Sequence, residues 1–264
     1  DQAQQTFPNG LWWIKDRENV SPHQLVSSVT NASQGGGNFA NLMPDPSLAV
    51  PYAAPSGSSV AWCWDASNPE VSGFNIVEYT GQNPTVTAVP HGLGQAPELI
   101  ILHSTTGTAR NYAYWTLKIG KNGYFWLNQL DQKGQNSNLW DNSLPDETNF
   151  YVGADNRTNQ SGSKFTAYCW APKENYSSFD IYTGNGQANG PMVYTGHSVE
   201  FLLIKAETQD LDWVLLDAGR DPFNPVTHSL PSSLDVNENT QTVEVDFLSN
   251  GFNTFWINFN KNNS

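Results

Sequence analysis

An internal repeat built on a short aromatic strand constrains the fold more than any other feature. Ala-Trp-Cys-Trp at residues 61–64 has a near copy, Ala-Tyr-Cys-Trp, at residues 167–170. The stretches that follow also match, because Gly-Phe-Asn-Ile starts at Gly73 and Ser-Phe-Asp-Ile starts at Ser178, and both lead to Tyr-Thr-Gly. A fixed order of motifs indicates a duplication, and a duplication decides the architecture.

The rest of the pattern predicts an all-β chain. Apolar runs at residues 11–15, 98–103 and 201–205 and a cleanly alternating run at 242–247 are separated by Gly, Pro, Asn and Asp. We find no amphipathic helix of ten residues or more. This pattern is typical of antiparallel sheets. The expected fold class is therefore all-β, with repeated antiparallel β-sandwich units of the jelly-roll kind.

The motif order divides the chain into one partial unit and two full units. The first unit, residues 1–72, carries only the second half of the order, whereas the second unit, 73–172, and the third unit, 173–264, carry all of it. A half unit cannot bury its face alone, so we expect its strands to pack against the other units or a partner chain. In the third unit, residues 179–182 are predicted to form a strand. Residues 255–259 fall where the Ala-aromatic-Cys-Trp strand is expected, without its alanine or cysteine.

Charge and hydropathy limit the partners. The chain has 12 Lys and Arg against 25 Asp and Glu, a formal net charge of -13 and a pI near 4.5. Nucleic acids and anionic membranes attract basic patches, so neither is an expected partner. There is no apolar run of about 18 residues, so we expect no membrane insertion. A surface of uncharged polar residues is common in extracellular and virion β-proteins.

Several motifs together carry a resemblance to a known family. They are Ala-Trp-Cys-Trp at 61–64 and the segments Leu-Trp-Trp-Ile-Lys-Asp-Arg at 11–17, Gly-Phe-Asn-Ile at 73–76, His-Gly-Leu-Gly-Gln-Ala-Pro-Glu-Leu-Ile-Ile at 91–101, Tyr-Thr-Gly-Asn-Gly at 182–186, Gly-Pro-Met-Val-Tyr-Thr-Gly at 190–196 and Asp-Phe-Leu-Ser-Asn-Gly-Phe at 246–252. In this order they resemble a repeat domain of unassigned function found in tail and other virion proteins of tailed phages, particularly marine and cyanobacterial phages. The resemblance implies a structural protein of the fibre, adhesin or decoration type, and it implies no catalytic residues.

The resemblance also implies partners and a location. A tail fibre or receptor-binding appendage would lie in the virion, outside the cell, and would contact other virion proteins and host surface polysaccharide. A homo-oligomer is expected, by analogy a trimer. One alternative is a capsid decoration or tail scaffold protein without a host ligand. Another is a polysaccharide depolymerase, which would need two facing carboxyl groups.

Three longer loops, at residues 105–112, 131–141 and 155–163, are the candidates for recognition. Their Asn, Gln and Ser side chains offer paired donors and acceptors to sugar hydroxyls, and a tryptophan could stack on a sugar face. The alternative is an ordinary solvated loop in which Trp140 folds over the edge of the sandwich. The candidate ligand-binding residues are Asn138, Trp140, Asp141, Asp155, Asn156 and Arg157.

Patterns for metal and nucleophile chemistry are missing from the sequence. No zinc spacing, Asp-x-Asp-x-Asp-Gly loop or Gly-x-Ser-x-Gly elbow occurs, so we expect no cofactor and no enzyme. A looser Ca²⁺ site made of loop carboxylates and carbonyls is the one ion that an acidic virion protein would suit. His91 and His197 are predicted to cap backbone groups in turns. Cys63 and Cys169 are predicted to be buried free thiols.

Overall fold

The protein is all-β, which confirms the predicted fold class. The computed structural model describes residues 9–19, 23–27, 39–40, 58–106, 113–232, 237–238 and 243–257. In these residues the helices are single turns, α1 (Pro69–Ser72), η1 (Leu117–Ile119) and α2 (Asn156–Asn159). The division into three sandwich units stays a prediction, and we keep the unit names only to locate strands.

The first unit contributes one four-stranded sheet. Its strand order is β3-β2-β1-β4, and β1 pairs antiparallel with both β2 and β4. β4, which contains the first Ala-Trp-Cys-Trp motif, is therefore an edge strand. The strands are β1 (Gly10–Asp16), β2 (His23–Ser27), β3 (Phe39–Ala40) and β4 (Ser59–Asp65).

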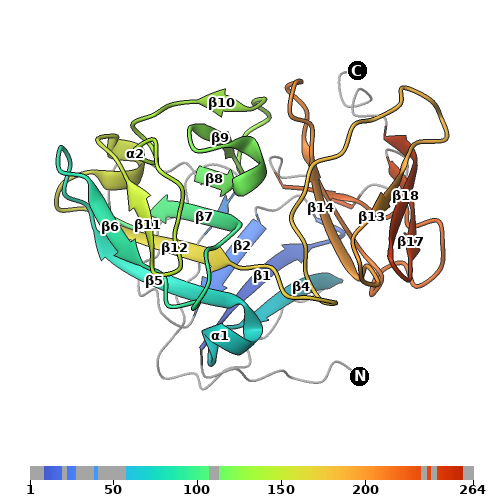
Figure 1. Ribbon diagram of the computed structural model, residues 1–264. Helices are drawn as coiled ribbons and strands as arrows, with labels where there is room; N and C mark the ends of the chain where they lie inside the picture. The colour runs from blue at the N-terminus through green and yellow to red at the C-terminus, as the bar shows by residue number, and fades with distance from the viewer. Residues whose placement is uncertain are drawn as a thin grey trace.

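The second unit has two layers. A six-stranded sheet in the order β10-β9-β8-β7-β12-β5 is covered on one face by the two-stranded ribbon of β6 and β11 (Figure 1). β12, which contains the second motif, is paired on both sides, with β7 and with β5. The strands are β5 (Phe74–Thr80), β6 (Thr87–Pro90), β7 (Leu99–Ser104), β8 (Ala113–Thr116), β9 (Gly123–Trp126), β10 (Gly134–Gln135), β11 (Asn149–Val152) and β12 (Lys164–Trp170).

The third unit also has two layers, with a shorter inner sheet. The inner sheet has the order β14-β15-β16, and the outer sheet has the order β13-β18-β17. A core of valines, Ile204, Leu216 and Phe252 lies between the two sheets. The strands are β13 (Met192–Tyr194), β14 (Phe201–Lys205), β15 (Trp213–Asp217), β16 (Leu230–Pro231), β17 (Val243–Leu248) and β18 (Gly251–Ile257).

One register recurs in the three inner sheets. Leu11 of β1, Leu99 of β7 and Phe201 of β14 occupy the same position in the pairing pattern, and all three side chains face the same core. Because a slip of one residue would turn each strand's apolar side chains to the other face, this agreement fixes which strands correspond. In the order of the units, the cross-strand partners of these residues on β2, β8 and β15 are Ser27, Thr116 and Asp217.

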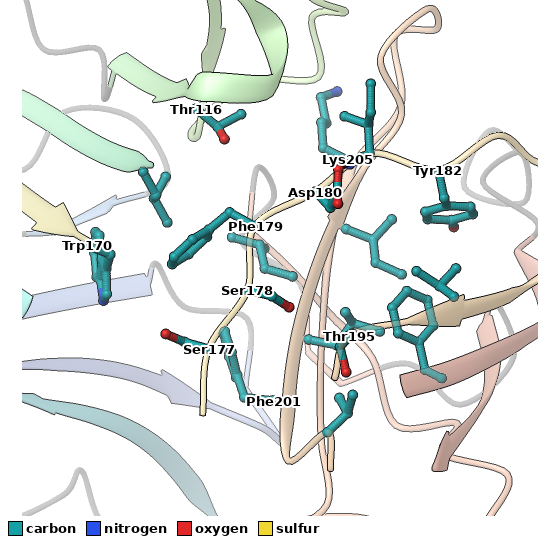
Figure 2. Close-up of a pocket in the computed structure, with 18 of the residues that line it drawn as sticks. Thr116, Trp170, Ser177, Ser178, Phe179, Asp180, Tyr182, Thr195, Phe201 and Lys205 are labelled. Atoms are coloured by element: carbon teal, nitrogen blue, oxygen red, sulfur yellow. Dashed lines mark hydrogen bonds between the residues drawn. The ribbon is translucent and has the colours of Figure 1, made fainter. Parts of the chain in front are cut away.

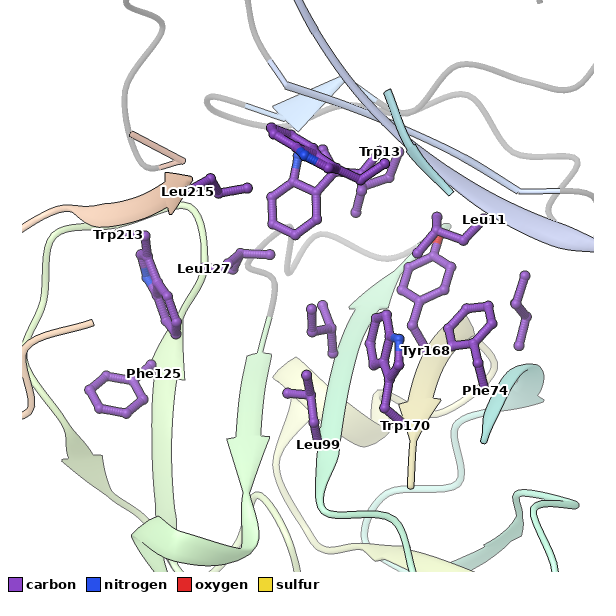
Figure 3. Close-up of a cluster of buried hydrophobic side chains, with 14 of the residues drawn as sticks. Leu11, Trp13, Phe74, Leu99, Phe125, Leu127, Tyr168, Trp170, Trp213 and Leu215 are labelled. Carbon is purple, nitrogen blue, oxygen red and sulfur yellow. The ribbon is translucent and has the colours of Figure 1, made fainter. Parts of the chain in front are cut away.

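The inner faces of the three sheets meet in one central core. Figure 3 shows Leu11 and Trp13 of the first unit, Trp170 of the second and Trp213 of the third converging on it. Buried aromatic side chains of this size contribute about 2–3 kcal/mol each by removal from water. The strands of the first unit therefore bury their inner face against the other two units.

Hydrogen bonds across this core join the units in pairs. The Trp62 indole donates to Asp217 at 3.0 Å, which joins the first unit to the third, and Ser27 is hydrogen-bonded to the Tyr168 hydroxyl, which joins the first to the second. Trp213 of the third unit donates to the carbonyl of Trp126 at 3.0 Å. The units form one body through both apolar and polar contacts.

Three expectations about individual segments are wrong. Residues 179–182 form no strand, because the position beside them that β12 fills in the second unit holds no described strand. Phe255 lies in β18, in the outer sheet, and not beside β14. Cys63 is exposed because its side chain points outward from an edge strand, whereas Cys169 is buried, and both are free thiols.

Candidate functional site

A long groove of about 1890 Å³ runs between the second and third units. One wall is the inner face of β7, β8 and β9, and the other is β14 together with the chain at residues 173–198. Aromatic rings and Ser or Thr hydroxyls both line it, as Figure 2 shows. The composition suits an extended ligand that offers both apolar and hydrogen-bonding groups.

The segment of residues 177–183 passes through the groove and connects its two sides. Phe179 packs into the central core and is directed toward Trp170, whereas Tyr182 packs against Phe252 in the core of the third unit, with ring centroids 5.9 Å apart (Figure 2). Asp180 makes an exposed ion pair with Lys118 at 3.6 Å. The segment is thus held at a few points and has no ladder of backbone hydrogen bonds.

β14 presents a free edge to the groove. The N–H of Ala218 donates to the carbonyl of Glu200, which fixes the phase of pairing between β14 and β15. In an antiparallel pair the alternate residues point their backbone groups away from the partner. The backbone groups of Phe201, Leu203 and Lys205 therefore face the groove, and no other described strand pairs with them.

Thr116 supplies a buried polar atom without a partner. The residue is only 8% exposed, it lines the groove, and its Oγ1 has no hydrogen-bond partner among the residues that the structure describes. Burying a hydroxyl without a hydrogen bond costs about 1–3 kcal/mol. The atom indicates a place where a ligand group could bind.

Lys205 is the last residue of β14, and its amine lines the groove and has a lowered pKa. Burial lowers its pKa to about 8, although nearby carboxylates, Asp212 first among them, act in the opposite direction. Its ammonium group donates to the carbonyl oxygens of Leu130 and Leu211. Through its hydrogen bond to Leu130 the lysine joins the third unit to the second.

The rim of the groove exposes two tyrosines. Tyr176 and Tyr194 are each 71% exposed. Each precedes by two or three residues a member of a polar contact, in which Ser178 Oγ and His197 Nε2 lie 3.3 Å apart. The neighbouring residues 183–189, which include Asn185, are all exposed. Exposed aromatic rings can stack on a sugar, and exposed amide side chains can hydrogen-bond its hydroxyls.

The predicted stacking role of Trp140 is wrong. The side chain is 3% exposed and packs against Trp115, with ring centroids 6.4 Å apart, in the core between the two layers of the second unit. Leu139 beside it is also buried, and the carbonyl of Leu139 accepts from Gly153. Leu139 and Trp140 fill space between the two layers, close to the alternative given above in which Trp140 folds over the edge. No face of the Trp140 ring is left for a sugar.

The other predicted residues lie close together but mainly hold the two loops to each other. Asp155 caps α2, binds Arg157 through both carboxylate oxygens and accepts from Asn136 at 3.0 Å. Burial alone would raise the pKa of Asp155, but the hydrogen bonds from Arg157 outweigh it and lower the pKa. The side chain of Asn156 accepts a hydrogen bond from Asn83.

Asn138 and Asp141 lie on the same loop. Asn138 is exposed, and its backbone N–H donates to the side chain of Asn136 at 2.9 Å. Asp141 is half-buried and has a φ of 54°, a conformation that Asp tolerates in tight turns. A ligand-binding role for these residues stays a prediction, as it does for the loop at 105–112, of which residues 107–112 lie outside the described residues.

Two further predictions from the sequence concern histidines in turns and metal ions. His91 is fully buried, its Nε2 lies 2.9 Å from the carbonyl of Asp146 and its Nδ1 accepts from the N–H of Leu93, which confirms a turn-capping role. Within the described residues there is no group of three or more His, Cys, Asp or Glu side chains that could hold a metal ion. No described helix has the length and hydropathy to cross a membrane.

The groove residues were missed at the level of sequence. Tyr114, Thr116 and Phe125 sit on ordinary strand patterns and would be assigned to the core. One signal did point here, since residues 255–259 lack the alanine and cysteine of the motif strand. That departure marks a unit whose central strand does not come from the expected place.

Comparison with known proteins identifies a family without assigning a function. No curated protein matches the chain, and no solved structure does. Residues 51–264, which are most of the chain, match the family described as a domain of unknown function, DUF7483. The chain therefore belongs to the DUF7483 family.

Proposed function

We propose that this protein is a subunit of a phage virion, in a tail fibre or similar receptor-binding appendage, and that it acts by binding host surface glycan and not by catalysis. The motif resemblance and the weakly charged, acidic surface support the virion assignment. The observation that carries glycan binding is the exposure of two tyrosines that line the groove, Tyr176 and Tyr194, and of the amide-containing residues 183–189 that lie between them in the sequence.

This surface replaces the Trp140 loop as the candidate for recognition. A tyrosine ring supplies a flat apolar face at a small cost in side-chain entropy, and its hydroxyl remains available to water or a ligand. Single contacts of this kind are weak. We propose that the protein works as a homo-oligomer, by analogy a trimer, in which several sites bind one polymer and the effective concentration raises the avidity.

A structural subunit without a host ligand is the second candidate. β4 and β14 favour it, because each has an edge that no described strand pairs with, and unpaired strand edges are templates for pairing with another chain. In that case the neighbours of this protein would be other virion proteins and the exposed tyrosines would have no ligand.

Binding of labelled protein to envelope material from candidate host bacteria, before and after periodate oxidation of glycans, tests the proposal. We expect saturable binding that oxidation abolishes. The double variant Tyr176→Ala, Tyr194→Ala should weaken it by about tenfold, since each stacked aromatic ring contributes about 0.5–1.5 kcal/mol.

Phe223→Ala is the matched control. Phe223 is 83% exposed and does not line the groove, so its removal tests whether any exposed ring matters. Equal losses in the control and the double variant would reject the tyrosine surface. Folded protein that binds no envelope preparation would favour the structural subunit.

A further inference from the structure

The groove corresponds to the position of a strand that the other two units possess. β4 lies beside β1 in the first unit and β12 lies beside β7 in the second, in the same register, with Trp64 opposite Leu11 and Trp170 opposite Leu99. The equivalent residue of the third unit, Phe201, has a described neighbour on one side only.

The backbone of β14 has the phase that such a strand requires. In the second unit the N–H of Leu117 donates to the carbonyl of Glu98, so Leu99 and Ile101 direct their backbone groups toward β12. In the third unit Phe201 and Leu203 are the equivalent residues, and their backbone groups face the groove. The edge is therefore set to accept an antiparallel partner.

The groove also offers a hydrogen-bonding group at the position where the other two motif strands make a polar contact. Trp62 of β4 donates to Asp217, and Tyr168 of β12 is hydrogen-bonded to Ser27, so in both cases an aromatic residue of the motif strand reaches the equivalent position of the next sheet. Thr116 is the third equivalent position. It is buried, lines the groove and has no partner among the described residues.

We infer that the groove is a binding site for a β-strand, supplied by a separate partner chain, that alternates small residues with aromatic ones in the pattern Ala-aromatic-Cys-Trp. The strand would pair with the free edge of β14, place its first aromatic residue opposite Leu203, and hydrogen-bond Thr116 through that residue. This is recognition by strand addition, in which backbone bonds give affinity and side-chain pockets give specificity.

The partner chain is favoured over a second copy of this protein for a structural reason. The two motif strands of this chain, β4 and β12, are both built into their own sheets, and neither can leave without opening the central core. The inference concerns the deep part of the groove and does not depend on glycan binding at the rim.

A labelled peptide with the sequence of residues 162–172 is the probe, and its binding to the whole protein is followed by fluorescence anisotropy. We expect saturable binding, and none for a scrambled peptide. In β12 the backbone groups of Thr166 and Tyr168 face β7, whereas those of Ala167 and Cys169 face β5. N-methylation at the first two positions should abolish binding, and N-methylation at the last two should weaken it less.

A double-mutant cycle tests the contact with Thr116. A peptide with Phe in place of its Tyr should bind about three- to tenfold more weakly than the parent, as expected for one lost hydrogen bond. That difference should vanish in the Thr116→Val protein, which keeps the shape of the side chain. These measurements compare ligands on folded protein, so a stability change cannot imitate them.

Three results would overturn the inference. Monodisperse, folded protein that does not bind the peptide rules out the strand site. Peptide binding that is indifferent to Thr116→Val and to the position of N-methylation places the peptide elsewhere. Concentration-dependent self-association in sedimentation, blocked by the peptide, identifies a second copy as the occupant instead of a separate chain.

Discussion

In the second unit the motif strand β12 lies beside β7, whereas the third unit has no described strand at the equivalent place beside β14, and this difference decides how the neighbouring chain is ordered. In the second unit β12 pairs with β7 and with β5, and all but its first residue are buried. In the third unit no described strand pairs with the outer edge of β14, and the chain at residues 177–183 runs beside it without forming a strand. The same sequence pattern gives a strand in one unit and an extended segment in the other.

The comparison shows that a segment forms a strand in this protein only where a neighbouring strand is present to pair with it. Phe-Asn-Ile at residues 74–76 and Phe-Asp-Ile at residues 179–181 have similar β propensity, but only the first has a ladder to join. Measured β propensities mainly report packing against cross-strand neighbours, so the missing neighbour explains the difference. Ile76 is buried and Ile181 is 55% exposed for the same reason.

The largest expected effect separates two equivalent phenylalanines. Phe74 is fully buried against Trp170, with ring centroids 4.8 Å apart, and Phe74→Ala should lower the free energy of unfolding by about 3–5 kcal/mol. Phe179 is half-buried in the groove, and Phe179→Ala should cost only about 1–2 kcal/mol. Urea denaturation at pH 7 measures both. Equal losses would mean that residues 177–183 are packed as firmly as β5.

A second contrast concerns two arginine–carboxylate pairs. Arg220 is nearly buried and joins Asp217 at 2.6 Å and Glu238 at 2.7 Å, and Glu238 also binds Arg17 of the first unit at 2.8 Å. Arg220→Met should cost about 3 kcal/mol, because it leaves the buried Asp217 carboxylate without its cation, whereas Glu238 keeps Arg17. Arg157→Met, at a pair in which the arginine is partly exposed, should cost less than about 1 kcal/mol.

Thermal unfolding of the two arginine variants gives the order of these losses. If Arg157→Met proved the more destabilising, the loops of the second unit, and not the joint between the first and third units, would limit stability. A conservative Arg220→Lys variant separates charge from geometry, since lysine cannot reproduce the two-sided contact.

The sequence predicted the strands better than their assembly. Alternation at residues 242–247 and the apolar runs near Leu99 and Phe201 gave β17, β7 and β14, because two-residue periodicity is a local signal. The strand expected at residues 255–259 was misplaced. Whether an aromatic run joins the inner or the outer sheet depends on contacts made far away along the chain, which no local pattern records.

The candidate site could not be predicted for a related reason. Trp140 lies between polar residues, and whether its ring turns outward or into the core is settled by the space beside Trp115. Thr116 is one threonine on a strand, and only its burial without a partner distinguishes it. Both facts depend on the folded arrangement.

A third prediction is that acid lowers the free energy of unfolding through two buried histidines, His23 of the first unit and His103 of the second. Burial lowers the pKa of His23 to about 3 and that of His103 to about 4, from 6.5 in the unfolded chain. Between these values the unfolded chain binds more protons, so stability falls as the pH decreases. From pH 8 to pH 5 each histidine should remove about 2 kcal/mol.

Unfolding midpoints in urea at a series of pH values measure this slope. His23→Gln, in which the amide oxygen can still accept from the Trp13 indole, should flatten it. His197→Gln, at a half-buried histidine of the third unit, is the matched control substitution. A slope between pH 8 and pH 5 that persists in a His23→Gln, His103→Gln double variant would contradict this assignment, because carboxylates such as Glu238, whose pKa the hydrogen bonds from Arg17 and Arg220 lower against burial, lose their contribution only below about pH 5.

The smallest effect has the most informative sign. Ser27 and Thr116 occupy equivalent positions, but Ser27 is hydrogen-bonded to Tyr168 whereas Thr116 lacks a described partner. Ser27→Ala should therefore cost about 1 kcal/mol, and Thr116→Val should be neutral or stabilise by up to about 1 kcal/mol, because it removes a buried hydroxyl that makes no bond. Calorimetric unfolding of the isolated protein resolves both. A clear loss for Thr116→Val would show that the hydroxyl already has a partner in the free protein, and the third unit would then be complete without an added strand. A gain would mean that the chain keeps an unfavourable group in its groove, which is expected where stability of the free protein is given up for binding.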